Sequence, residues 1–169
     1  RIIGPHGLGI MCAASKLNAS LAPRMPLFGK LAFVSQSRGI CSAILDYSAK
    51  EKIGFSHLIG LGSMQDVEFG DIIDYLGAES GASSILMHME TLTHYRKFMS
   101  AARAASRIKP IIVLKTGRTT TPMLSAASAT GSVTEEDAVF DAAFQRAGIV
   151  RVKTFEELFD TAQILSRKG

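Results

Sequence analysis

The fold is decided by residues 29–52, Gly-Lys-Leu-Ala-Phe-Val-Ser-Gln-Ser-Arg-Gly-Ile-Cys-Ser-Ala-Ile-Leu-Asp-Tyr-Ser-Ala-Lys-Glu-Lys. Residues 31–35 form a short apolar run between a Gly-Lys pair and a polar turn, which is typical of a buried strand. Apolar residues then recur at helical spacing, which predicts a helix over residues 40–52. The residues expected on its inner face are Ile40, Ile44, Leu45 and Tyr47. This stretch is therefore one strand–turn–helix unit.

The same alternation continues to the end of the chain. Further strands are expected at residues 56–61, 84–89, 111–114 and 149–152. Helices are expected at residues 69–76, 94–107 and 135–146, and a last helix is expected after Thr154, with Glu157 completing a capping box. Five strands, each followed by a helix, predict an α/β, flavodoxin-like (Rossmann-like) doubly wound parallel sheet in three layers, α/β/α. The expected strand order is 2-1-3-4-5.

Composition limits the possible functions. The net charge is +4, but basic residues form no stripe interleaved with aromatic residues, so nucleic acid is not an expected partner. No apolar run reaches the roughly 18 residues of a membrane span, and no signal peptide is visible. Cys12 and Cys41 lack metal-ligand spacing and are interpreted as reduced residues of a cytoplasmic protein without a metal site.

The chain is expected to have three parts. Residues 1–10 begin in mid-pattern at Arg1 and contain three closely spaced glycines, so they are interpreted as the end of a preceding domain. Residues 11–29 are interpreted as a linker in which Pro23 and Pro26 discourage a helix. Residues 30–169 form the main domain. A chain that begins this way is expected to be part of a longer polypeptide.

Ligands of doubly wound sheets bind beyond the carboxyl ends of the strands. Four segments are expected to meet at this edge: residues 36–39, 60–66, 90–93 and the loop 116–133. The loop is long and consists mostly of small or hydroxylated residues, which suits a phosphate or the active site of a partner. The alternative is a mobile surface loop. Residues 119–129 are expected to be the most mobile internal segment, followed by a helix capped by Thr134.

Several stretches in order resemble the succinyl-CoA synthetase and NDP-forming acyl-CoA synthetase superfamily. They are residues 29–37, 54–62, 71–76, 109–118 and 140–152. Gly4-Pro5-His6 is similar to the end of the family's CoA-binding domain, where the third residue is usually Asn. The resemblance implies CoA or acyl-CoA and ATP/ADP as cofactors of the whole protein. It also implies a preceding CoA-binding domain, a separate ATP-grasp domain and a possible homo-oligomer.

The resemblance also implies site residues. Ser35, Gln36 and Ser37 match the family's phosphate-facing turn, where Gly usually follows; here Arg38 precedes Gly39 and either binds an anion or blocks the site. The family's phosphorylated histidine lies in a Ser-His-Thr-Gly motif. The matching residues are Ser128, Ala129, Thr130 and Gly131. Alanine has no nitrogen to phosphorylate, so residue 129 is not expected to be catalytic.

Glu90 matches the family's glutamate that contacts this histidine. Without the histidine, Glu90 either keeps a role at an anion site, caps the third helix or pairs with Arg118. His88 lies inside an expected strand and is interpreted as a core histidine with a hydrogen-bond partner, not as a ligand.

Loss of the histidine resembles one branch of the superfamily, the bacterial protein lysine acetyltransferases in which a ligase-like region is fused to a GNAT domain. That branch implies a regulatory or acyl-CoA-sensing domain. The alternative is a fragment of a catalytic acyl-CoA synthetase whose histidine is lost or engineered, and a third reading is a plain interaction module. All three remain open from the sequence.

Overall fold

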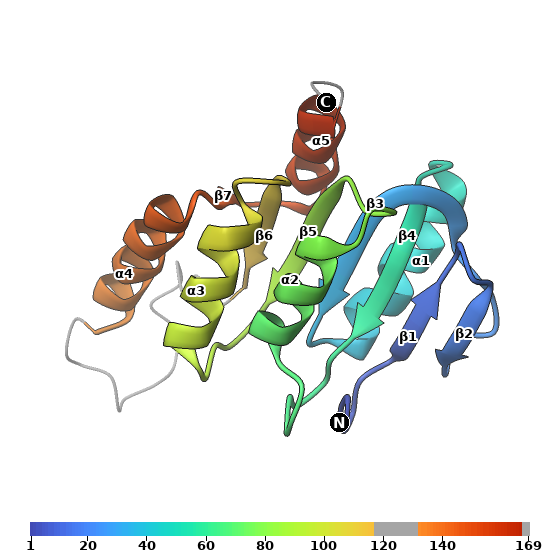
Figure 1. Ribbon diagram of the computed structural model, residues 1–169, viewed down its shortest axis with the longest axis horizontal. Helices are drawn as coiled ribbons and strands as arrows, with labels where there is room; N and C mark the ends of the chain where they lie inside the picture. Colours follow the sequence, from blue (N-terminus) through green and yellow to red (C-terminus); the bar gives the residue numbers. More distant parts are fainter. Residues whose placement is uncertain (117–131, 167–169) are drawn as a thin grey trace.

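The structure is a computed structural model that describes residues 1–116 and 132–166 (Figure 1). Strands and helices alternate along most of the chain, as the spacing of apolar residues predicts. The strands are β1 Gly9–Cys12, β2 Leu17–Ser20, β3 Leu27–Ser35, β4 Gly54–Gly60, β5 Ser84–Met89, β6 Ile111–Lys115 and β7 Val150–Val152. The helices are α1 Arg38–Lys50, α2 Phe69–Ala78, α3 Tyr95–Ala105, α4 Ser132–Ala147 and α5 Phe155–Ser166.

The described strands form one seven-stranded mixed sheet in the order β2-β1-β4-β3-β5-β6-β7. The neighbours among β4, β3, β5, β6 and β7 pair in parallel. The prediction of a purely parallel five-stranded sheet is therefore wrong in its extent, because β1 pairs antiparallel with β4 and β2 pairs antiparallel with β1. The sequence pattern hides this hairpin, since its strands are only four residues long and none of the β2 residues is fully buried.

The hairpin includes much of residues 11–29, which the sequence predicts to be a linker. They contain the end of β1, all of β2 and the start of β3, and the Cys12 Cα is paired with that of His57 in β4. This part of the chain belongs to the sheet, as Figure 1 shows. The assignment of residues 1–10 to a preceding domain remains a prediction.

Helices cover both faces of the sheet, which gives the expected three-layer α/β/α architecture (Figure 1). One core lies under α2, α3 and α4 and includes Phe69, Phe98 and Phe144. The other lies under α1 and α5 and includes Ile44 and Phe159. Among the described residues, no helix has the length and apolar character needed to cross a membrane.

The helices follow the predicted pattern, except at Tyr47 of α1 and at the start of α4. In α3, the four residues predicted to face inward are all buried: Phe98, Ala101, Ala102 and Ala105. In α1, Tyr47 is 41% exposed, while Cys41 is buried. Helix α4 begins at Ser132, so Thr134 lies inside it and the prediction that Thr134 caps it is wrong. Residues 132–134 contain no glycine or proline that would prevent the helix from starting there.

Candidate functional site

The site is the edge of the sheet where β3, β4, β5 and β6 end. The backbone joins these strand ends directly: the Leu61 N–H donates to the Ser35 carbonyl (2.8 Å), and the Thr116 N–H donates to the Met89 carbonyl (2.9 Å). Residues after the carboxyl ends of parallel strands gather at one edge, where α/β proteins bind ligands. The structure thus brings together Ser35–Gly39, Glu90 and the loop after β4, as the sequence predicts.

Ser35 and His88 form the buried base of this edge. They are neighbours in the β3–β5 pairing, and the Ser35 Oγ lies 2.9 Å from the His88 Nδ1. Both side chains are buried, and the His88 ring stacks on Phe155 with its centroid 5.8 Å away. Burial lowers the pKa of His88, which favours the neutral imidazole. The prediction that His88 is a hydrogen-bonded core histidine is confirmed.

Gln36 clamps two strand ends with its side-chain amide. Its Oε1 accepts hydrogen bonds from the backbone N–H groups of Glu90 (2.7 Å) and Thr91 (3.0 Å). Its Nε2 donates to the Thr91 Oγ1 at 3.0 Å. Gln36 was expected to face a phosphate, but its amide is already used inside the protein. Its observed role is to position the chain after β5.

Ser37 shapes the start of α1. It is the N-cap residue, and its Oγ accepts a hydrogen bond from the Ile40 N–H at 3.3 Å. The Ser37 N–H in turn donates to the Ser35 Oγ at 3.0 Å. Both hydroxyls expected to bind phosphate therefore take part in local bonds that form the turn. This leaves the first residues of α1, Arg38 and Gly39, at the mouth of the site.

Arg38 and Gly39 are both exposed at the N-terminus of this 13-residue helix. A Cβ built on Gly39 would meet only the Ser37 Oγ, 3.9 Å away, so there is open space over the helix end. Among the described residues, no hydrogen-bond acceptor faces the N–H groups of these two residues. Free N–H groups and the helix dipole favour an anion here, and a guanidinium next to them adds positive charge.

Glu90 lies beside this mouth with its side chain exposed. Its backbone is held on both sides, because its N–H donates to Gln36 and its carbonyl accepts a 2.8 Å hydrogen bond from the Lys115 Nζ. The interpretation of Glu90 as a helix cap is wrong: the N-cap residue of α3 is His94. Glu90 is too far from α3 along the chain to be its N-cap residue, since four residues separate it from Tyr95, the first residue of the helix.

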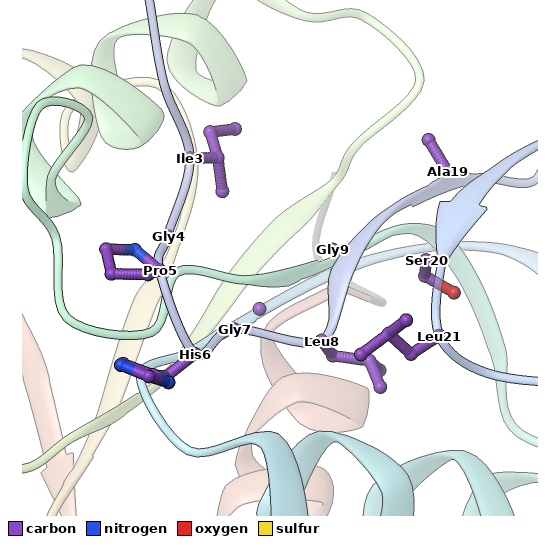
Figure 2. Close-up of a pocket in the computed structure, with 11 residues that line it drawn as sticks. Ile3, Gly4, Pro5, His6, Gly7, Leu8, Gly9, Ala19, Ser20 and Leu21 are labelled. Atoms are coloured by element: carbon purple, nitrogen blue, oxygen red, sulfur yellow. The ribbon is translucent and has the colours of Figure 1, made fainter.

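The N-terminal segment lies along the same edge. The N–H groups of Ser63, Gln65 and Val67 donate to the carbonyls of Pro5, Gly4 and Ile2 at 2.8–3.1 Å. Residues 3–9, 19–21 and Gly60 line a surface hollow of about 310 Å³, and Figure 2 shows Leu8 beside Leu21 at its border. Four of its eleven lining residues are glycines, which leaves main-chain groups accessible in part of its wall.

A charged cluster fixes the start of α2 below this segment. The Lys97 Nζ lies 2.6 Å from Asp71 and 3.1 Å from the buried carboxylate of Glu68, which also contacts the His94 Nδ1 at 2.7 Å. Arg1 pairs with Asp71 as well. Desolvation would raise the pKa of Asp71, but hydrogen bonds from Lys97 and Arg1 outweigh it and lower the pKa to about 2.

Several predicted site residues lie outside the described residues. They are Arg118 and the four motif residues Ser128, Ala129, Thr130 and Gly131. The expected mobility of residues 119–129 and the alternative Glu90–Arg118 pair also fall in this part. These statements remain predictions from the sequence.

Two residues that organise the edge were not expected from the sequence. Lys115 joins the carbonyls of Glu90 and Thr116 with its ammonium group, which also lies 5.0 Å from the centroid of the Phe140 ring. Asp71, with Glu68 and Lys97, ties α2 to α3. A lysine that directly follows four apolar strand residues was a usable signal, because such a residue ends a strand at the edge where ligands bind. The long-range partners of Asp71 left no sequence signal.

Comparisons with known proteins match the chain to one domain family. Residues 28–165 match the family model of the succinyl-CoA ligase-like flavodoxin domain. The alpha subunit of ADP-forming acetate–CoA ligase I from Pyrococcus furiosus is 38% identical over 98% of this chain and 36% of its own length. The ADP-forming acetate–CoA ligase of Methanocaldococcus jannaschii is 39% identical over 98% of this chain and 23% of its own length.

A solved structure gives the same result. It is the dinucleotide-forming acetyl-coenzyme A synthetase 1 of Ca. Korarchaeum cryptofilum in complex with phosphate and ADP. It superposes with a TM-score of 0.85 at 34% identity, over 98% of this chain and 36% of that one. The chain therefore spans about a quarter to a third of the length of these relatives. By the family model and by these identities, the chain belongs to the succinyl-CoA ligase-like flavodoxin domain family.

Proposed function

We propose that this chain is the ligase-like domain of a protein related to ADP-forming acyl-CoA synthetases, and that it binds a phosphate group at the N-terminus of α1. The observation that carries the proposal is the open helix end at Arg38 and Gly39, at the carboxyl edge of the sheet. Relatives that are 38% and 39% identical across nearly the whole chain carry the name ADP-forming acetate–CoA ligase. A related structure contains phosphate and ADP.

The residues around this helix end have different roles in the proposed site. The N–H groups of Arg38 and Gly39 and the guanidinium of Arg38 bind the phosphate oxygens, which are strong acceptors. Ser35, Gln36 and Ser37 build the turn that presents them, through their bonds to His88, Glu90 and Ile40. Ser128, Thr130 and Gly131 come from the loop after β6 and add small donors to the same site.

CoA or acyl-CoA and ATP/ADP bind to the whole protein, not to this domain alone. In this proposal a preceding CoA-binding domain and an ATP-grasp domain flank the edge, and the protein works in the cytoplasm, as a possible homo-oligomer. The acyl transfer balances as acyl-CoA, ADP and phosphate giving carboxylate, CoA and ATP. The domain's own part is to hold phosphate next to the reacting acyl group.

A second candidate function is favoured by Ala129. An alanine in the Ser-Ala-Thr-Gly sequence at 128–131 supplies no nucleophile to carry a phosphoryl group. In this alternative the domain binds acyl-CoA or phosphate as a signal and regulates a lysine acetyltransferase whose chemistry lies in a GNAT domain. The first candidate then requires a phosphoryl carrier other than residue 129.

The test uses the full-length protein with acetyl-CoA, ADP and phosphate, and measures ATP and free CoA. The first candidate predicts ATP formation that falls about tenfold or more in Arg38→Gln, because a charge-assisted hydrogen bond is lost. The same protein incubated with labelled ATP should carry no acid-labile label on this domain. Acetyl transfer to lysine peptides without any ATP formation would overturn the first candidate and support the second.

A further inference from the structure

Helices α3 and α4, together with Leu92 before α3, line an apolar cavity of about 220 Å³, which we call the α3–α4 slot. Its main lining residues are Tyr95, Phe98 and Met99 of α3 and Phe140, Ala143 and Phe144 of α4. Phe98, Phe140 and Phe144 are at most 7% exposed, whereas Tyr95 is 52% exposed. The slot thus has a buried floor and an opening beside Tyr95.

Four aromatic rings line the slot as a chain of neighbouring pairs. The ring centroids of Tyr95 and Phe140 are 6.1 Å apart, those of Phe140 and Phe144 are 5.7 Å apart, and those of Phe144 and Phe98 are 6.1 Å apart. All three pairs are tilted or edge-to-face, the arrangements that aromatic rings prefer. An apolar cavity of roughly 150 Å³ already accepts a benzene-sized molecule. The slot therefore has the size and lining for one more small ring.

Positive charge in an adjoining hollow favours one kind of ligand. A second hollow, lined by Arg96, Ser100 and Arg103, shares Tyr95 and Met99 with the slot. Among the described residues, neither arginine has an acidic partner. Aromatic cages often bind cations, but two arginines in the adjoining hollow, and Lys115 on the Phe140 ring, disfavour a cation. Arginine instead pairs well with a carboxylate.

We propose that the α3–α4 slot binds a small aryl carboxylate, with its ring among Phe98, Phe140 and Phe144 and its carboxylate at Arg96 and Arg103. The ligand is smaller than a typical drug, because drug-sized ligands occupy sites of roughly 300–1,000 Å³, whereas the slot has a volume of about 220 Å³. The proposal does not rest on the proposed function, since neither Arg38 nor Gly39 takes part in it.

Three probes separate the contributions of the ring and the charge. They are 3-phenylpropionate, propionate and 3-phenylpropan-1-ol, titrated into the full-length protein and followed by calorimetry or by ligand-observed NMR. Burial of a ring predicts that 3-phenylpropionate binds about tenfold or more tightly than propionate. Its charged hydrogen bonds to arginine predict about tenfold tighter binding than the neutral alcohol.

Two variants locate the binding. Ala143→Leu fills the slot and should abolish detectable binding of 3-phenylpropionate, whereas Ala142→Leu changes an exposed neighbour on the same helix and should leave it unchanged. Arg96→Gln combined with Arg103→Gln should weaken binding about tenfold, whereas Arg107→Gln removes a charge beyond the end of α3 and should not. Circular dichroism and a thermal melt check that each variant folds.

The probe comparison needs no variant, so it decides the case even if Ala143→Leu fails to fold. Equal binding of 3-phenylpropionate and propionate would overturn the proposal, because the slot would then contribute nothing. Equal binding of 3-phenylpropionate and the alcohol would overturn the role of the arginines and with it the carboxylate. Unchanged binding in a folded Ala143→Leu protein would place the ligand elsewhere and would also overturn it.

Discussion

The two ends of the carboxyl edge are held together in different ways. At one end, side chains do the work: Gln36 binds the backbone of Glu90 and Thr91, and Ser35 binds His88. At the other end, residues 2–9 are joined to residues 60–67 by backbone groups, which approach so closely that a Cβ on Gly7 would lie 2.2 Å from the Gly60 oxygen. One end depends mainly on side-chain hydrogen bonds, and the other mainly on backbone hydrogen bonds and on the missing side chain of Gly7.

The largest expected effect is at the backbone-held end. Gly7→Ala pushes a methyl group against the Gly60 carbonyl, which cannot move without disturbing the end of β4. We expect the free energy of unfolding to fall by about 3 kcal/mol or more, as measured by urea denaturation. Gly39→Ala is the matched control, since its Cβ meets open space within α1, and it should stabilise the protein by about 0.5–1 kcal/mol. Similar values for both variants would refute the close packing.

This contrast also separates what the sequence predicts from what it does not. The five parallel strands and the buried face of α3 were predictable, because apolar periodicity is a local property. The capping box at the start of α5 was predicted in part. The Thr154 Oγ1 accepts a hydrogen bond from the Glu157 N–H, as expected. The Glu157 carboxylate, however, accepts a hydrogen bond from the Lys153 N–H and not from that of Thr154.

The β1–β2 hairpin and the contacts of residues 2–9 were not predictable in the same way. The partners of β1 in β4 and those of residues 2–5 lie 45 to 65 residues further along the chain, and a glycine does not indicate which backbone it contacts. At the carboxyl edge, the resemblance assigned Ser35, Gln36 and Ser37 to a ligand. Only the distances show that these side chains bind their own protein.

The second effect concerns the side-chain-held end. Gln36→Leu keeps the size of the side chain but leaves the N–H groups of Glu90 and Thr91 without their acceptor. We expect a loss of about 2 kcal/mol in stability, and faster hydrogen exchange at the amides of residues 90 and 91. Gln36→Glu retains an acceptor oxygen and should keep those amides more protected than Gln36→Leu. Equal protection in both variants would show that the clamp is not needed.

The third effect tests the buried base of the same end. Burial lowers the pKa of His88 below its ordinary value of 6.5, so the unfolded chain binds a proton more readily than the folded one. Stability should therefore be complete above about pH 6.5 and should decrease as the pH falls below it. The contribution of His88 to this slope cannot exceed about 1.4 kcal/mol per pH unit, the value for one proton.

Urea denaturation of the wild type and of His88→Gln between pH 7.5 and 5.5 measures this contribution. The variant should be less stable at pH 7.5, because a ring stacked on Phe155 is lost, but its stability should depend less on pH. His57 is also buried with a pKa lowered by desolvation, so part of the slope will remain in the variant. An unchanged slope would show that His88 keeps its proton equilibrium on unfolding.

The smallest expected effect tests whether side chains also help to hold the N-terminal segment to the edge. Asp71 of α2 accepts hydrogen bonds from Lys97 of α3 and from Arg1, and so links the residue that precedes residues 2–9 to both helices. Asp71→Asn should cost only about 1 kcal/mol, because Lys97 and Arg1 are partly exposed and solvent screens their charges. Asp74→Asn, on the exposed side of the same helix, should cost less and serves as the control.

The pH dependence of the same variant gives a sharper answer. The pKa of Asp71 is lowered from 3.8 to about 2, so its contribution is present above about pH 4 and is lost as the pH falls toward 2. Asp71→Asn should therefore lose less stability than the wild type over this range, in acid titrations followed by circular dichroism. If the two proteins lose stability in parallel, Arg1 and Lys97 do not bind Asp71 in solution. Residues 2–9 would then be held to the edge by their backbone hydrogen bonds, by the bond from the Ile2 N–H to Asp66 and by the buried Leu8, without help from Asp71.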